Sequence, residues 1–226
     1  RPYRPPLPFP RRAPARAAVL EMSWKIPAAL MLMLAVAIVA ARLAQGPESG
    51  TATWDASRSA GFAAYLLLWA SVVTGMSIHL RLRPTSSPLT YILEAHRITS
   101  TLGLSFVFAH VFSLLLDPVV HFKIADAFIP FSSDFRPIQV GLGTISQWLL
   151  VLVLATTAFS GRFSYGLWRK LHYLSFPCYL LALVHGITSG TDSAAPFALI
   201  IYASTSAVVA AVGVLRVAGR GWVRAA

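Results

Sequence analysis

Two stretches of this sequence decide the fold: residues 96–110, HRITSTLGLSFVFAH, and residues 172–185, HYLSFPCYLLALVH. Each begins and ends on a histidine inside a long apolar run, and the two histidines are 14 residues apart in the first and 13 in the second. At a helical rise of about 1.5 Å per residue, each pair spans roughly 20 Å of a hydrocarbon core about 30 Å thick. Ionisable side chains at that depth indicate a functional site, and imidazole is a common axial ligand of haem iron. The spacing therefore predicts two haems stacked along two membrane helices.

The composition is that of a membrane protein. The chain has 226 residues, of which 56% are hydrophobic and 12% are charged. Six apolar stretches are each close to the length of about 20 residues that a spanning helix needs: Ile26–Ala44, Gly61–Leu80, Ala95–Leu116, Ile138–Ser160, Leu171–Gly190 and Ala194–Ala218. We therefore predict an all-α integral membrane bundle of six helices over residues 26–218. A basic, proline- and arginine-rich arm (1–25) precedes it and a short tail (219–226) follows.

The positive charge is distributed asymmetrically along the chain. The net charge is +11. Sorted by alternate connections, most basic residues fall on the side of the two termini, and most acidic residues fall on the other side. By the positive-inside rule, both termini are expected in the cytoplasm. The membrane is expected to be the inner or plasma membrane of a bacterium. Because a basic membrane flank explains the charge, we expect contact with the lipid bilayer and no nucleic-acid partner.

The predicted topology pairs the histidines across two helices. The third and fifth predicted helices run in the same direction, so His96 and His172 share the cytoplasmic end while His110 and His185 lie deeper, towards the outer side. Each pair can hold one b-type haem between the two helices, with one neutral imidazole from each helix. We therefore predict two haem b groups, with these four histidines as the iron ligands.

Other residues near the histidines have two interpretations each. Arg97, Arg169 and Lys170 flank the cytoplasmic pair, either as anchors for haem propionates or as charges that set the topology. Gly103 lies between His96 and His110, either to admit a porphyrin edge or to allow close helix packing.

The 13-residue spacing creates a problem of phase. At about 100° per residue, His172 and His185 fall roughly 140° apart around a straight helix, whereas the 14-residue pair stays within about 40°. Pro177 lies between the two histidines, lacks an N–H group and crowds the carbonyl of Tyr173. We therefore predict that the fifth helix is distorted near Pro177.

The remaining polar residues of the apolar regions are expected to have plainer roles. His79 and His121 fall at predicted membrane interfaces, and an outer metal site of His121, Asp117 and Asp126 is a weak alternative. Cys178, the only cysteine, is predicted to be a buried apolar residue. The connection 117–137 contains three prolines and is expected to hold a small re-entrant or amphipathic element.

These motifs resemble the ferric reductase-like transmembrane domain family. The resemblance rests on His96-Arg97, Gly103 and His110, on residues 168–174 (WRKLHYL) and on His185-Gly186 with residues 190–193 (GTDS), and it covers about residues 61–218. The family includes ferric reductases, NADPH oxidases and the haem-bearing membrane subunit of the periplasmic methionine sulfoxide reductase system. The resemblance implies a six-helix haem domain that passes electrons across the membrane, with the four histidines at the family's ligand positions.

The leading hypothesis is a cytochrome that relays electrons between a cytoplasmic or quinol donor and an outer acceptor. The alternatives are a terminal reductase of ferric chelates or oxygen at the outer haem, and an accessory haem subunit of a larger membrane complex. An electron-transfer subunit is expected rather than a self-sufficient enzyme, because Gly141-Leu142-Gly143 lacks the third glycine of a dinucleotide fingerprint and opens an apolar stretch. Electrons are expected from a redox partner protein, which could carry a flavin, or from a quinol.

Overall fold

The computed structural model describes residues 51–80 and 89–225, together with residues 31, 33, 36–40 and 43. In this part of the chain all regular structure is helical: α2 (Thr51–Leu80), α3 (Leu89–Leu115), α4 (Ile124–Phe128), α5 (Pro137–Ala158), η1 (Ser160–Arg162), α6 (Tyr165–His172), α7 (Ser175–Ser189) and α8 (Pro196–Ala225). The predicted all-α class is confirmed. The predicted arm 1–25 and most of the predicted span Ile26–Ala44 lie outside the described residues.

Five segments of the described chain are long and apolar enough to cross a membrane: Ala52–Ile78, Leu89–Leu115, Pro137–Ala158, Tyr165–Ser189 and Pro196–Ala218. They overlap the last five of the six predicted spans. The helices α2 and α3 begin ten and six residues earlier than predicted, at Thr51 and Leu89. Hydropathy did not predict the first turns of α2, because these turns carry polar side chains that are buried and hydrogen-bonded. Thr53, for example, donates to Asp117 Oδ2 at 2.8 Å.

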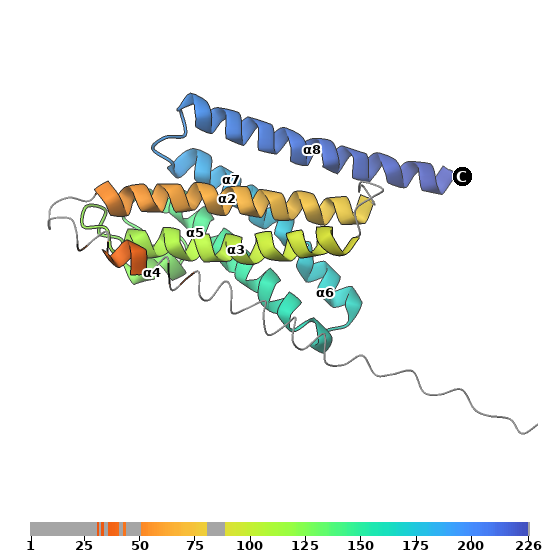
Figure 1. The fold of residues 1–226 in the computed structure, drawn as a ribbon, viewed down its shortest axis with the longest axis horizontal. Coiled ribbons are helices and arrows are strands. Elements are labelled where there is room, and N and C mark those ends of the chain that lie inside the picture. The colour runs from red at the N-terminus through yellow and green to blue at the C-terminus, as the bar shows by residue number, and fades with distance from the viewer. Residues whose placement is uncertain are drawn as a thin grey trace, which may run out of the picture.

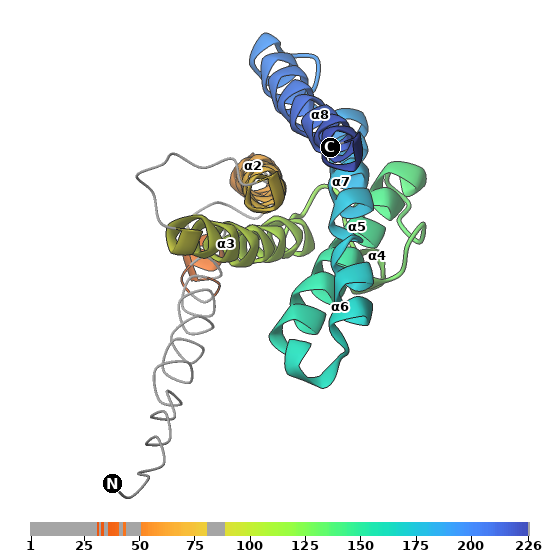
Figure 2. The same ribbon diagram turned by 90° about the vertical axis from the view of Figure 1, so that its right-hand side faces the viewer.

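The helices form two antiparallel pairs, and a further helix, α8, packs against α2. Antiparallel α2 and α3 pack along most of their lengths, and α5 packs in the same way against α7 (Figures 1 and 2). The last helix, α8, lies against α2 and places Tyr202 and Ala198 in the shared core. The predicted common direction of α3 and α6–α7 is confirmed, since both run from right to left in Figure 1.

Aromatic and small residues fill the core between the pairs. Tyr65 of α2 stacks on Tyr179 of α7, and its hydroxyl lies 2.6 Å from Thr205 Oγ1 of α8. Cys178 is fully buried in this cluster, where its thiol donates to the carbonyl of Ser146 at 3.4 Å. This places Cys178 as predicted, and it ties α5 to α7 at the level between the two histidine pairs.

Candidate functional site

The four histidines meet in the two predicted pairs. The ring centroids of His96 and His172 lie 5.9 Å apart, with the ring planes crossing at 65°. Those of His110 and His185 lie 6.2 Å apart, crossing at 79°. We refer to the two ends of the bundle as the His96 end and the His110 end. In each pair one imidazole comes from α3, and the other comes from α6 or α7.

The gap between the paired rings fits one metal ion. A metal–imidazole bond is about 2 Å long, and the centre of an imidazole lies roughly 1.1 Å from each ring atom. Two rings on opposite sides of one metal therefore have centroids about 6.2 Å apart. Both observed distances agree with this value. Within the described residues no group of three or more His, Cys, Asp or Glu side chains gathers to hold a metal alone. A haem iron receives its other ligands from the porphyrin and needs only two imidazoles, so the residues present fit haem.

Three of the four histidines are turned so that Nε2 is available as a ligand. The Nδ1 atoms of His96, His110 and His185 each lie 2.8 Å from a backbone carbonyl oxygen, those of Ser71, Ser57 and Gln139. A carbonyl oxygen only accepts, so each Nδ1 donates and carries the proton. The lone pair is then on Nε2, which is the arrangement that orients a metal-binding histidine.

His172 is held in a different way. Its Nδ1 lies 3.5 Å from Thr157 Oγ1, at the limit of a hydrogen bond. The indole of Trp168 stacks on the imidazole with centroids 5.2 Å apart and donates to the same Oγ1 at 3.4 Å. The Thr157 hydroxyl itself donates to the carbonyl of Val153, which leaves its lone pairs for the two ring N–H groups. His172 is therefore oriented by a side chain and a ring rather than by a helix carbonyl.

Glycines allow three of the imidazoles to approach the neighbouring helices. A Cβ atom on Gly143 would lie 2.7 Å from His185 Nδ1. On Gly61 it would lie 3.1 Å from His110 Nδ1, and on Gly75 it would lie 3.1 Å from His96 Cε1. Each of these glycines makes room for a histidine ring beside the carbonyl to which that ring donates. Gly103 instead faces Leu67 and Leu68 of α2, so its role in this structure is helix packing.

Sequence reasoning missed these supporting residues, although a signal was present. In α2, Ser57 and Gly61 are followed 14 residues later by Ser71 and Gly75, and 14 residues is also the spacing of the α3 histidines. Fourteen residues is close to four helical turns, so the two sets repeat on one face of α2. A search for the histidine period in the other helices would have found both supports.

The helix that carries His172 and His185 is interrupted between these two residues, as predicted. Helix α6 ends at His172 and α7 begins at Ser175. The carbonyl of Tyr173 accepts from Phe176 N at 3.1 Å, in the place of the N–H group that Pro177 lacks. The interruption lies between the two histidines, and both of them meet histidines of α3 despite their 13-residue spacing.

A cavity surrounds the His110–His185 pair. Its space amounts to about 1410 Å³ when the part open to solvent is included. Its walls come from α2, α3, α5, α7, α8 and the connections between α3 and α5 and between α7 and α8. Most of the lining is apolar. The exception that carries charge is the ion pair of Arg58 and Asp192, which lines the cavity and is partly exposed. Neither residue was predicted as part of the site.

The three predicted propionate anchors lie on the exposed surface of the His96 end. Arg97 donates to Glu94 at 3.1 Å, and Arg169 Nε donates to the Tyr173 hydroxyl at 2.9 Å. Lys170, which follows Arg169 in the sequence, is also exposed. Arg97 directly follows His96, and Arg169 and Lys170 shortly precede His172 in the sequence. Their role as anchors of haem propionates stays a prediction.

The alternative outer metal site has its carboxylates already engaged. Asp117 accepts from the backbone N–H groups of Val119 and Val120, and Asp126 accepts from Lys123 N and the Ser132 hydroxyl. These bonds shape the connection between α3 and α5. The side chain of His79 lies outside the described part of the structure.

Comparisons with protein-family models, with curated proteins and with solved structures each give no match. The site therefore has to be interpreted from its own geometry.

Proposed function

We propose that this chain is a transmembrane b-type cytochrome that relays electrons through two haem b groups, one held by His96 and His172 and the other by His110 and His185. The observation that supports the proposal best is the geometry of the two imidazole pairs. Both separations suit one intervening metal, and three of the rings donate from Nδ1 to a carbonyl so that Nε2 faces away from the helix that bonds it. When bound, haem b supplies a one-electron couple at each level.

The protein's own residues would do three things in this function. They hold the imidazoles neutral and oriented, and they keep water from most of the His110 cavity by lining it with apolar side chains. They also place the two sites in series. The 14 residues from His96 to His110 correspond to about 21 Å along α3, which is most of a hydrocarbon core about 30 Å thick.

The donor and acceptor belong to the proposal as chemical classes. A redox partner protein or a quinol would deliver electrons at one end, and an acceptor would take them at the other. The resemblance to the ferric reductase-like transmembrane domains and the basic side of the sequence support a cytoplasmic His96 end. The chain would then act in the lipid bilayer as the electron-transfer subunit of a larger oxidoreductase.

A second candidate function is terminal reduction at the His110 end. The observation that favours it is the cavity, which is partly open and carries the Arg58–Asp192 ion pair among its lining residues. A small oxidant such as oxygen or a ferric chelate would then be reduced without another protein. Rapid oxidation of the purified, prereduced chain by either oxidant would favour this function over the relay.

The relay is tested with the purified chain in sealed vesicles that contain trapped ferricyanide, with dithionite added outside. The haem-loaded wild type is expected to reduce the trapped ferricyanide, and His96→Ala and His110→Ala are each expected to abolish that reduction. The matched control is His121→Asn, since His121 lies outside both pairs and its backbone has φ 51°, which asparagine tolerates. Transfer at the wild-type rate in both ligand variants would contradict the relay.

A further inference from the structure

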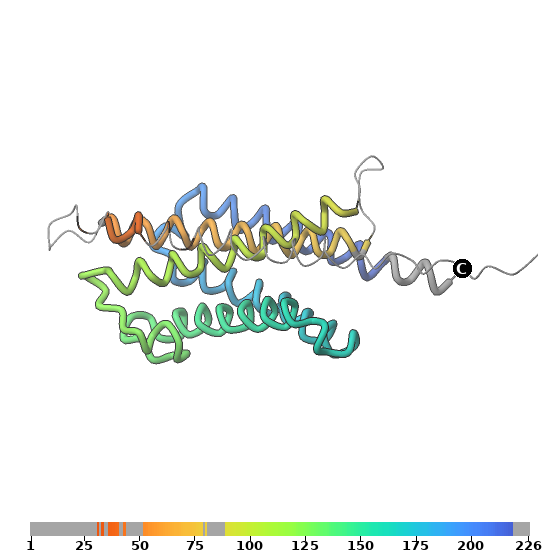
Figure 3. Tube along the Cα trace, turned by 60° about the horizontal axis from the view of Figure 1, so that its bottom comes forward, coloured from red at the N-terminus to blue at the C-terminus, as the bar shows by residue number. Residues whose placement is uncertain are grey.

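The connection between α3 and α5 extends from the end of the bundle along the side of α5. It carries the short helix α4, and the last three carbonyls of that helix are bonded by side chains of α5. Thr144 Oγ1 donates to the Asp126 carbonyl at 3.2 Å, Gln147 Nε2 to that of Ala127 at 3.2 Å and Trp148 Nε1 to that of Phe128 at 2.9 Å. Figure 3 traces this connection beside the first turns of α5.

These bonds fix how far α4 reaches along α5. Thr144 and Trp148 follow Pro137, the first residue of α5, by 7 and 11 residues, which is about 10 and 16 Å at the helical rise. Helix α5 has 22 residues and is therefore about 33 Å long, close to the thickness of a hydrocarbon core of about 30 Å. A spanning α5 leaves little overhang outside the core. The carboxyl end of α4 must then lie inside the core.

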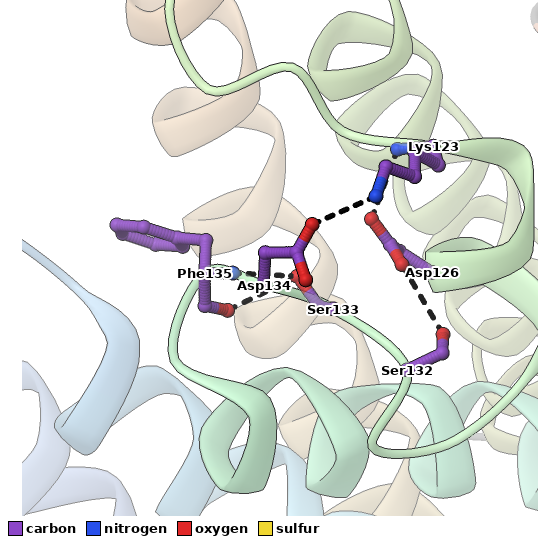
Figure 4. A network of polar contacts seen from close by, with 6 residues as sticks. All are labelled: Lys123, Asp126, Ser132, Ser133, Asp134 and Phe135. Atoms are coloured by element: carbon purple, nitrogen blue, oxygen red, sulfur yellow. Dashed lines mark hydrogen bonds and ion pairs between the residues drawn. The ribbon is translucent and has the colours of Figure 1, made fainter.

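The polar groups of the connection are satisfied as an embedded segment requires. Non-helical backbone at membrane depth is tolerated only where other protein groups bond it. The Asp126 carboxylate is buried and accepts from Lys123 N at 2.9 Å and from the Ser132 hydroxyl at 3.2 Å (Figure 4). Three charged side chains of the connection remain exposed. Lys123 and Asp134 bind each other at 2.7 Å, and the long lysine side chain can reach the interface. Arg136 donates to the carbonyls of Thr188 and Ser189, each at 3.1 Å.

The two faces of the connection differ sharply. One face, with Ala127 and Phe135, lines the cavity of the His110–His185 pair. The other face exposes apolar side chains: Ile124 is 70% exposed, Phe128 50% and Ile129 58%. The Phe128 ring also lies 6.1 Å from the half-exposed ring of Trp148 on α5, so the apolar surface of α4 continues onto a spanning helix.

We propose that residues 117–136 form a re-entrant segment that enters the membrane leaflet at the His110 end. The acyl chains of that leaflet contact its exposed face at Ile124, Phe128 and Ile129. Its opposite face is the wall that separates the His110 cavity from lipid. The bonds from α5 to the α4 carbonyls and the continuity with the lipid-facing side of α5 carry this proposal, and it does not depend on which cofactor the histidines hold.

The test measures the membrane depth of single spin labels in the full chain reconstituted in phosphatidylcholine vesicles. Cys178→Ser provides the background, because the serine hydroxyl can donate to the same Ser146 carbonyl. Labels are attached at Ile124→Cys, Phe128→Cys and, as a second set on the same face, Ile129→Cys. Two reference positions are Leu152→Cys, 40% exposed on spanning α5, and Asp134→Cys, whose side chain is 86% exposed in the connection.

Collision with oxygen and with a water-soluble nickel chelate then reports the surroundings of each label. The proposal expects the ratio of oxygen to nickel collisions at positions 124, 128 and 129 to match Leu152→Cys and to exceed Asp134→Cys several-fold. Ratios equal to that of Asp134→Cys would place α4 in water and overturn the proposal. Labels shielded from both reagents would also overturn it, since a second copy of the chain would then cover the face instead of lipid.

Discussion

The two histidine pairs have nearly the same separation but are built differently. At the His110 end, both rings donate to helix carbonyls, those of Ser57 and Gln139, and an apolar cavity surrounds them. At the His96 end, only His96 has such a carbonyl, while His172 depends on the Thr157 hydroxyl and the stacked Trp168. Backbone carbonyls are fixed by the helices, whereas a hydroxyl rotates. The comparison therefore predicts one rigid site and one adjustable site on the same pair of helices.

The largest effect is expected from removing one of the four proposed haem ligands. His185→Ala should abolish the haem at the His110 end and leave the other, so about half of the haem absorption should remain. His172→Ala should do the reverse. The measurement is haem content per chain together with a redox titration, in which each variant should retain a different one of the two wild-type components. Loss of both haems in each variant would show that the two sites are not independent.

The next largest effect is expected from filling the space that glycine leaves beside a ligand. Gly143→Ala places a methyl group 2.7 Å from His185 Nδ1, and the contact is too close for the ring to stay in place. We expect a haem affinity at the His110 end lower by roughly ten- to a hundredfold, as for lost outer-shell support. Gly75→Ala, with its contact at 3.1 Å to His96, should weaken the His96 end less.

Gly213→Ala is the matched control, because a Cβ there meets nothing within 4 Å. Its haem affinities should equal those of the wild type. Equal losses in Gly143→Ala and Gly213→Ala would mean that the close approach of Gly143 to His185 is unimportant.

A smaller and more selective effect is expected at Thr157. Thr157→Val keeps the shape of the side chain and removes the oxygen that His172 Nδ1 and Trp168 Nε1 share. Losing an acceptor at Nδ1 makes the ligand less basic, so the reduction potential of the haem at the His96 end should rise. Because the bond is long, the affinity should fall by less than about tenfold.

The potential at the His110 end should stay constant in the same titration. An unchanged potential at the His96 end would show that Trp168 alone orients His172.

The smallest effect concerns the connection beside the His110 cavity. The hydrogen bond and the charge of Lys123 lower the pKa of the Asp134 carboxyl below its usual value of about 4. A lowered pKa means that the ion pair stabilises the fold above the usual value and that this contribution is lost as the pH falls through the lowered one. Both side chains are largely exposed, so the contribution is small.

Thermal melting of the wild type and of Asp134→Asn should therefore differ slightly at pH 7 and coincide near pH 2. A difference that persists at pH 2 would contradict a role for this ion pair.

The sequence predicted the parts of this arrangement that side-chain spacing encodes. The pairing of His96 with His172 and of His110 with His185 followed from depth and helix direction, and the break before Pro177 followed from helical phase. The start of α2 was missed because Ser57 and Thr53 are polar, and hydropathy does not register a buried polar residue that has a partner. The carbonyls of Ser57, Ser71 and Gln139 were missed for another reason. Every residue has a carbonyl, so only the packing of a neighbouring helix shows which one a histidine reaches.

The glycines show where prediction from sequence was misdirected. Gly103 drew attention because it lies between two histidines on the same helix, yet it packs against α2. The glycines beside the imidazole rings, Gly61 and Gly143 among them, are on helices that carry none of the four histidines. A close approach between two helices depends on the residues of both helices. The sequence pattern of one helix therefore cannot show where its partner comes close.

The central claim is that each histidine pair holds one haem iron between two imidazoles. The most direct test is to purify the chain from haem-supplemented cells, measure haem b per chain by the pyridine haemochrome spectrum and record the low-temperature electron paramagnetic resonance spectrum of the oxidised protein. Two haems per chain with two low-spin, bis-imidazole signals, of which Thr157→Val shifts one and Gly143→Ala weakens the other, are the predicted result. No bound haem in a folded protein, or high-spin iron with a single histidine ligand, would contradict the claim.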